Sequence, residues 1–285
     1  METTPLLVIG AGGHALSLAD VVIVDVQCDY FKETFGDVRQ GHADIAALED
    51  SLKIIGEKIS PECLVLIETT VPPGTTEYVA YPIVKKAFEK RGLTDTEPLL
   101  SHSFERVMPG RNYVASVRDF WRVCSGINEM ARNRVREFLS EIINVGQYPL
   151  TVLDRPIESE TCKIVENSFR ATLLAFLDEW SVFAERNGVD LIKVIEAIKV
   201  RPTHSNMIFP GPGIGGYCLP KDGGLGVWSY HTLMGSEPTV SQTPPPPPHP
   251  PPPAPHREGR PAEQHHLRPG RGRRDDPGRQ PRGLP

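Results

Sequence analysis

ADVVIVDV at residues 19–26 and LVLIETT at residues 64–70 are the two stretches that decide the fold. Each is a continuous apolar run of strand length, rich in β-branched residues, as expected of a strand buried on both faces of a parallel sheet. Between them, apolar residues at helical spacing predict an amphipathic helix over residues 43–59. Pro72 and Pro73 end the second strand, and the threonines that follow can cap another helix. Strand and helix in alternation predict a doubly wound α/β fold with a parallel sheet. The alternation continues with a helix over 76–91, a helix through 135–142 and a strand at 150–153.

A single long helix is predicted from Glu158 to Asn187. The carboxylates of Glu158 and Glu160 suit the positive end of this helix, and Gly188 stops it. At 1.5 Å per residue the helix would be about 45 Å long, which is more than one small domain needs. We therefore expect it to link the sheet domain to a second, helical domain that begins with residues 191–200.

The composition over most of the chain is that of an ordinary globular protein, with 39% apolar and 24% charged residues. The net charge of −5 has two parts. The tail (240–285) has eight arginines and four acidic residues, and the rest of the chain has a net charge of −9. An acidic body has no basic stripe for a phosphate backbone, so nucleic acid is not an expected partner. No stretch fits a membrane span or a signal peptide, which predicts a cytoplasmic protein with no membrane partner. The five cysteines are scattered without CxxC spacing, which predicts reduced thiols and no metal site.

The tail carries 15 of the 29 prolines of the chain and almost no large apolar residue. Such a segment cannot bury enough apolar surface to fold, so a disordered, partly polyproline II tail is predicted. Two origins stay open. The tail could be a ligand for a proline-binding module, or it could be coding sequence translated out of frame.

FPGPGIGGYCLPKD at residues 209–222 is the most informative stretch for chemistry. Its four glycines let a loop approach a ligand closely, and Cys218 follows them with Lys221 and Asp222 nearby. A thiol close to a lysine can be held as the thiolate, which is the nucleophilic form. The alternative is a glycine-rich turn with a buried structural cysteine.

The long helix and a loop before it supply further polar candidates. Lys163 and Asn167 are four residues apart, so an ammonium and an amide project from one face and could stabilise a developing oxyanion. SFERVMPG at residues 103–110 places the carboxylate of Glu105 in a loop. Taken singly, such side chains are usually solvated surface residues.

Taken together and in this order, the motifs resemble the UDP-glucose/GDP-mannose dehydrogenase family. The likeness is greatest to bacterial members that act on UDP-N-acetylmannosamine or similar sugars. It rests on five segments: ADVVIVDV, TTVPPGTTE, SFERVMPG, ESETCKIVENSFRATLLAFLDEW and FPGPGIGGYCLPKD.

The resemblance implies an NAD-dependent enzyme that oxidises the C6 hydroxymethyl of a nucleotide sugar to a carboxylate through a cysteine-bound intermediate. It also implies a homodimer formed through the long helix. The roles implied are nucleophile for Cys218, oxyanion contacts for Lys163 and Asn167, water positioning for Asp222, thioester hydrolysis for Glu105, and NAD contacts for Thr70 and Lys221.

The chain departs from the family at both ends. The run from Gly10 to Ala15 fits GxGxxA, which makes Gly10 and Gly12 candidate NAD ligands, but only Leu16–Leu18 separate it from the next strand. Three residues cannot form the helix of a complete dinucleotide-binding unit, and the proline-rich tail stands where the family has another α/β domain. The chain is therefore expected to be truncated at both ends and to show little turnover, with Cys218 still selectively reactive. The domains predicted are a partial NAD-binding Rossmann-like domain (1–155), a linker helix with an α-helical central domain (156–239), and the disordered tail (240–285).

Two other functions remain open. A 6-phosphogluconate or β-hydroxyacid type of dehydrogenase also uses a lysine and an asparagine on a helix, but it needs no nucleophilic thiol. A catalytically inactive scaffold could instead recruit a partner through the proline-rich tail.

Overall fold

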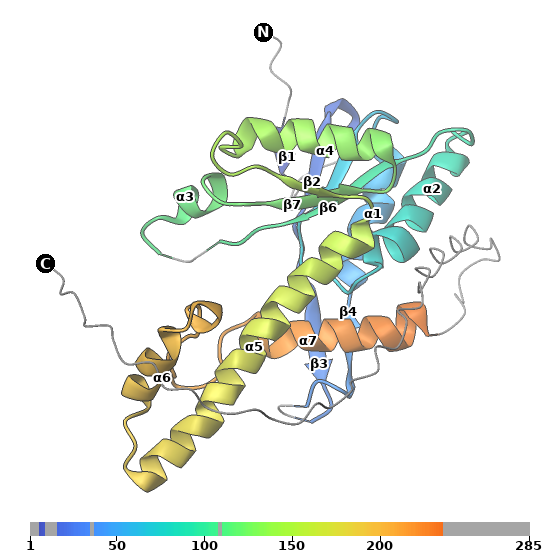
Figure 1. Cartoon of the computed structure of the whole chain (residues 1–285). Helices are drawn as coiled ribbons and strands as arrows, with labels where there is room; N and C mark the ends of the chain where they lie inside the picture. Colours follow the sequence, from blue (N-terminus) through green and yellow to red (C-terminus); the bar gives the residue numbers. More distant parts are fainter. Residues whose placement is uncertain (1–5, 9–15, 35–36, 108–109, 236–285) are drawn as a thin grey trace, which may run out of the picture. The chain divides into compact units, whose positions relative to one another are not determined.

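A six-stranded sheet forms the first half of the chain (Figure 1). The computed structural model describes residues 6–8, 16–34, 37–107 and 110–235. The strand order is β1-β2-β5-β6-β7-β8, and every neighbouring pair is parallel except β6 and β7. The strands are β1 (Leu6–Val8), β2 (Val21–Val24), β5 (Leu64–Ile67), β6 (Leu99–Phe104), β7 (Val123–Gly126) and β8 (Thr151–Leu153).

Helices cover both faces of this sheet, as the sequence predicted. Along β5 the side chains alternate: Val65 and Ile67 pack toward α1 (Ala46–Lys58) and α2 (Tyr81–Lys90), whereas Leu64 and Leu66 pack toward α4 (Glu129–Ile142). This alternation explains why the strand is apolar at every position, since each face of it is buried. The α/β class and the Rossmann-like sheet predicted from the sequence are confirmed.

Two local details differ from the expectation. The sheet is not wholly parallel, because the chain leaves β6 and re-enters as β7 at the same end after α3 (Tyr113–Arg118), which an antiparallel pair allows. The helix expected over 43–59 begins only at Ala46, because β3 (Asp29–Lys32) and β4 (Gly41–Asp44) form an antiparallel hairpin that pairs Tyr30 with Ala43. The Asp44 carboxylate accepts the N–H of Ala46, the first residue of this helix, at 3.0 Å.

The long helix α5 (Pro156–Asn187) runs from the sheet to the helices that follow it (Figure 1). Its N-terminal part packs on β6 and β7, and it also packs against α7 (Leu219–Trp228). Gly188 ends it in the left-handed conformation at φ 64°. The remaining helical segments are η1 (Leu16–Leu18), η2 (Thr76–Ala80), α6 (Leu191–Lys199), η3 (Pro202–His204) and η4 (Ser229–Met234).

Some predictions fall outside the described residues. Gly10 and Gly12 lie there, and so does the whole tail from 240 to 285. Among the residues that are described, no helix has both the length and the apolar character needed to cross a bilayer.

Candidate active site

Cys218 lies at the junction between the glycine-rich loop and α7. The side chain is exposed, and its backbone carbonyl accepts the N–H groups of Lys221 and Asp222, both at 3.0 Å, so the residue opens the first turn of the helix. Gly213 and Gly216 have φ values of 94° and 82°, a region that side chains disfavour. The loop conformation therefore accounts for two of the four glycines.

Asp222 joins α7 to α5. This carboxylate is fully buried, and its Oδ2 accepts a hydrogen bond from Asn167 Nδ2 at 2.6 Å. Its Oδ1 accepts one from Lys221 Nζ at 2.9 Å. A buried carboxylate needs such partners, because leaving it unpaired costs several kcal/mol. Three of the residues selected from the sequence are thus connected directly, one helical turn from Cys218.

Lys163 and Glu105 form a second connected pair. Lys163 Nζ donates to the backbone oxygen of Glu105 at 2.9 Å and lies 3.8 Å from its carboxylate Oε1. Nζ also lies 5.5 Å from the ring centroid of Phe104, at a cation–π distance. Lys163 is one turn before Asn167 on the same face of α5, so this helix contributes one member of each pair.

The loop after β5 is fixed by a residue whose role the sequence did not reveal. Glu160 is 1% exposed and accepts hydrogen bonds from Gly74 N–H at 2.5 Å, Thr76 N–H at 2.8 Å and the Thr76 hydroxyl at 2.6 Å. Thr70 lies half-buried just beyond β5, at the start of this loop. Glu160 therefore ties the loop that follows Thr70 to the helix that carries Lys163.

Other contacts around Cys218 were also not predicted. Tyr217 donates its hydroxyl hydrogen to Asp29, and Lys221 Nζ lies 5.0 Å from the Tyr217 ring centroid. No local pattern indicates these pairings, because the two partners of the hydrogen bond are 188 residues apart. Acidic residues in the first turn of a helix indicate capping. Glu158 does cap α5, because its carboxylate accepts the N–H of Arg155 at 2.9 Å, whereas Glu160 does not cap this helix.

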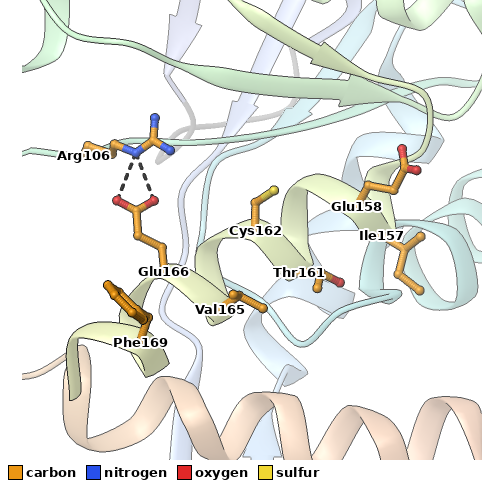
Figure 2. Close-up of a pocket in the computed structure, with 8 residues that line it drawn as sticks. All are labelled: Arg106, Ile157, Glu158, Thr161, Cys162, Val165, Glu166 and Phe169. Carbon is orange, nitrogen blue, oxygen red and sulfur yellow. Dashed lines mark hydrogen bonds and ion pairs between the residues drawn. The ribbon is translucent and has the colours of Figure 1, made fainter. Parts of the chain in front are cut away.

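A cavity lies on the other face of α5 (Figure 2). It measures about 830 Å³, and Arg106 closes one side through an ion pair with Glu166 at 3.0 Å. Its wall includes Cys162, Val165 and Phe169, but none of the site residues selected from the sequence. Helical periodicity explains this, since Lys163 and Asn167 project from the opposite side. Across the described ranges, no group of three or more His, Cys, Asp or Glu side chains is arranged to hold a metal ion.

Two family models match the chain and together span both halves of the site. The NAD binding domain of the UDP-glucose/GDP-mannose dehydrogenase family matches residues 11–143, and the central domain of that family matches residues 157–242. The chain belongs to this family. The family predicted from the ordered motifs is therefore confirmed.

Individual relatives agree with this assignment. The UDP-N-acetyl-D-mannosamine dehydrogenase of Pyrococcus horikoshii is 34% identical over 181 residues, which are 63% of this chain and 41% of the relative. The Escherichia coli K12 enzyme of the same name is 28% identical over 183 residues, or 63% and 42% of the two chains. A solved structure of UDP-D-ManNAc dehydrogenase from Pyrococcus horikoshii superposes with a TM-score of 0.61 at 28% identity, covering 76% of this chain and 48% of that one. The region of this chain that matches covers less than half the length of each of these relatives.

Proposed function

We propose that this chain oxidises the C6 hydroxymethyl of a UDP-linked sugar to a carboxylate in an NAD-dependent reaction, with Cys218 as the nucleophile. The hydrogen bond between Asn167 and Asp222 is the observation that carries the proposal. It connects the helix with the oxyanion candidates to the helix that begins at Cys218. The names of the relatives, which act on UDP-N-acetyl-D-mannosamine, support a UDP-sugar as substrate.

The proposed reaction divides a four-electron oxidation into two steps. Bound NAD would supply the hydride acceptor for both steps, and in each step the hydroxyl on C6 also loses its proton. After the first, the Cys218 sulfur adds to the aldehyde carbon and the carbonyl oxygen takes up a proton. After the second, the carbon is a thioester, and water cleaves its C–S bond to release the carboxylate and return the thiol. The covalent bond keeps the aldehyde from escaping between the steps.

The donors needed for the oxyanion are only partly used by the protein. A lysine ammonium has three N–H donors, and Lys163 gives one to the Glu105 backbone oxygen. The Asn167 amide has two donors, and one goes to Asp222. Both side chains can therefore donate to a substrate oxygen without losing the contacts that hold them, while Glu105 and Asp222 act on the water.

Among the described residues, Thr70 is placed where an NAD contact is expected. Because β1, β2 and β5 are parallel, their carboxyl ends share one edge of the sheet, and Thr70 lies half-buried just beyond this edge. The N–H groups of Gly74 and Thr76 cannot receive a phosphate, because Glu160 already accepts from both. Gly10 and Gly12, which lie outside the described residues, stay proposed contacts for the pyrophosphate. Lys221 stays a proposed NAD contact.

The test is NADH formation by the full chain with NAD and UDP-N-acetylmannosamine, UDP-glucose or GDP-mannose. Because the chain departs from the family at both ends, we expect slow turnover, with two NADH formed per sugar oxidised and no detectable NADH in Cys218→Ser. Cys162→Ser is the matched control, because this half-buried cysteine lies on the cavity face of α5. Supplying the 6-aldehyde of the sugar nucleotide tests the second oxidation alone.

Two results would contradict the proposal. One is an absence of NADH with every sugar nucleotide and with the aldehyde, and the other is a wild-type rate in Cys218→Ser. A loss in Cys162→Ser equal to that in Cys218→Ser would show that the cysteines act through folding rather than through chemistry.

A further inference from the structure

The loop that carries Cys218 has few contacts of its own. A side chain placed at Gly211, Gly213, Gly215 or Gly216 would meet no atom within 4 Å. Glycine loses more conformational freedom on ordering than any other residue, so an open glycine loop is costly to hold in one conformation. The position of the thiol therefore depends on what anchors the end of this loop.

Tyr217 supplies a contact between the loop and the sheet domain. Its hydroxyl donates to Asp29 Oδ1, and Asp29 Oδ2 accepts from Gln27 Nε2. A hydrogen bond to an ionised carboxylate is stronger than one between neutral groups. The residue next to Cys218 is thus hydrogen-bonded to Asp29, the first residue of β3.

Asp29 lies on a well-held part of the chain. The preceding turn is fixed to the end of β5, because the Thr69 hydroxyl accepts Val26 N–H and donates to the Val26 carbonyl, both at 2.8 Å. The following residue, Tyr30, is buried against α7. The acceptor therefore belongs to a rigid frame, and the donor belongs to the loop that needs holding.

We infer that Tyr217 and Asp29 form a positioning pair, the Tyr217–Asp29 anchor, which holds Cys218 at the start of α7. The inference rests on the function proposed for Cys218. The anchor continues into the site, because Lys221 lies over the Tyr217 ring and donates to Asp222, which accepts from Asn167. Burial and the bond to Asp29 raise the pKa of Tyr217 to about 12, so the hydroxyl remains a donor at neutral pH.

Hydrogen exchange of the full chain, read by mass spectrometry over residues 211–218, tests the anchor. Tyr217→Phe and Asp29→Ala are each expected to speed exchange about three- to tenfold, as for the loss of one net hydrogen bond. The double variant should exchange no faster than either single variant, because both remove the same bond. Asp29→Asn keeps an acceptor oxygen and should restore slower exchange. Tyr230→Phe is the control, since it removes the hydroxyl of another exposed tyrosine, in η4.

The exchange result does not depend on turnover. Unchanged exchange over 211–218 in Tyr217→Phe, or an equal increase in Tyr230→Phe, would overturn the anchor whether or not the chain is active. In the NADH assay, Tyr217→Phe should lower kcat and leave KM for the sugar nucleotide within twofold. A rise in KM with unchanged kcat would instead assign the hydroxyl to substrate binding and would also overturn the anchor. Absence of NADH in the unmodified chain contradicts the proposed function and leaves the exchange result to decide the anchor.

Discussion

Glu160 has a pKa that burial raises from 4.5 to about 7, against the effect of its three hydrogen-bond donors. A carboxyl whose native pKa exceeds its unfolded value binds its proton more tightly in the folded state. The stability that this proton contributes is fully present below pH 4.5 and is lost as the pH rises through about 7. The folded chain therefore becomes less stable across this interval because of this one residue.

Glu160→Gln removes this titration and should flatten the pH dependence of unfolding. Relative to the variant, the unmodified chain should lose up to about 3 kcal/mol between pH 4.5 and pH 7 and above, because one pKa unit corresponds to about 1.4 kcal/mol. Urea unfolding of both proteins at pH 5 and pH 8 measures the difference. Glu158→Gln is the control, since this carboxylate caps the exposed start of α5. Parallel pH profiles for the unmodified chain and Glu160→Gln would contradict the shift.

The sequence named the candidate site residues but could not give their pairings. Spacing alone puts Lys163 and Asn167 on one face of α5, because four residues make about one helical turn. The bond from Asn167 to Asp222 and the contact of Lys163 with Glu105 depend on how distant segments pack. Glu160 illustrates the difference. The helix dipole predicts an acidic residue at the start of α5, but the Glu160 carboxylate accepts the N–H groups of Gly74 and Thr76 at the start of η2.

The contact between α7 and the β3–β4 hairpin depends on a glycine. A Cβ at Gly224 would lie 2.3 Å from Cε1 of the Tyr30 ring, and Tyr30 is held by burial and by a hydrogen bond from its hydroxyl to the Val38 carbonyl at 2.9 Å. The ring cannot move away without breaking this packing. The neighbouring Gly223 has space, since the nearest atom to its Cβ would be Ser168 Oγ at 3.7 Å.

Gly224→Ala and Gly223→Ala should therefore have opposite effects on stability. Overpacking in Gly224→Ala should cost about 1–3 kcal/mol. Gly223→Ala should be neutral or stabilise α7 by up to about 1 kcal/mol, because alanine favours helices more than glycine does. The free energy of unfolding in urea measures both. Equal effects of the two variants would show that Tyr30 does not pack closely against α7.

At the scale of elements, the strands that could be predicted from the sequence are those with apolar residues on both faces. β2 and β5 are apolar throughout, because helices cover both of their faces. β7 reads only VCSG, and although it is buried beneath α4 and α5, its own residues carry little strand signal. The hairpin strands DYFK and GHAD are short, polar and separated by an eight-residue connection, which no turn motif marks.

At the scale of the whole molecule, α5 leaves a row of aromatic side chains uncovered in the described part of the chain. Phe169, Phe176, Trp180 and Phe183 are each about half exposed. Phe176, Trp180 and Phe183 contact one another edge to face, with ring centroids 6.4 and 5.4 Å apart. Spacings of three, four and seven residues put all four on one side of the helix. An aromatic ridge of this kind is typical of a surface that another chain covers.

The chain should therefore form a homodimer through α5, as the sequence also predicted. Light scattering after size exclusion should give twice the 31.5 kDa mass of one chain. Phe176→Asp with Trp180→Asp should shift the mass to that of a monomer, because a buried charge without a partner opposes association. Tyr113→Asp is the matched control, since Tyr113 is an equally exposed aromatic residue on α3. A monomeric mass for the unmodified chain at micromolar concentration, or the same dissociation in Tyr113→Asp, would show that this ridge is not the interface.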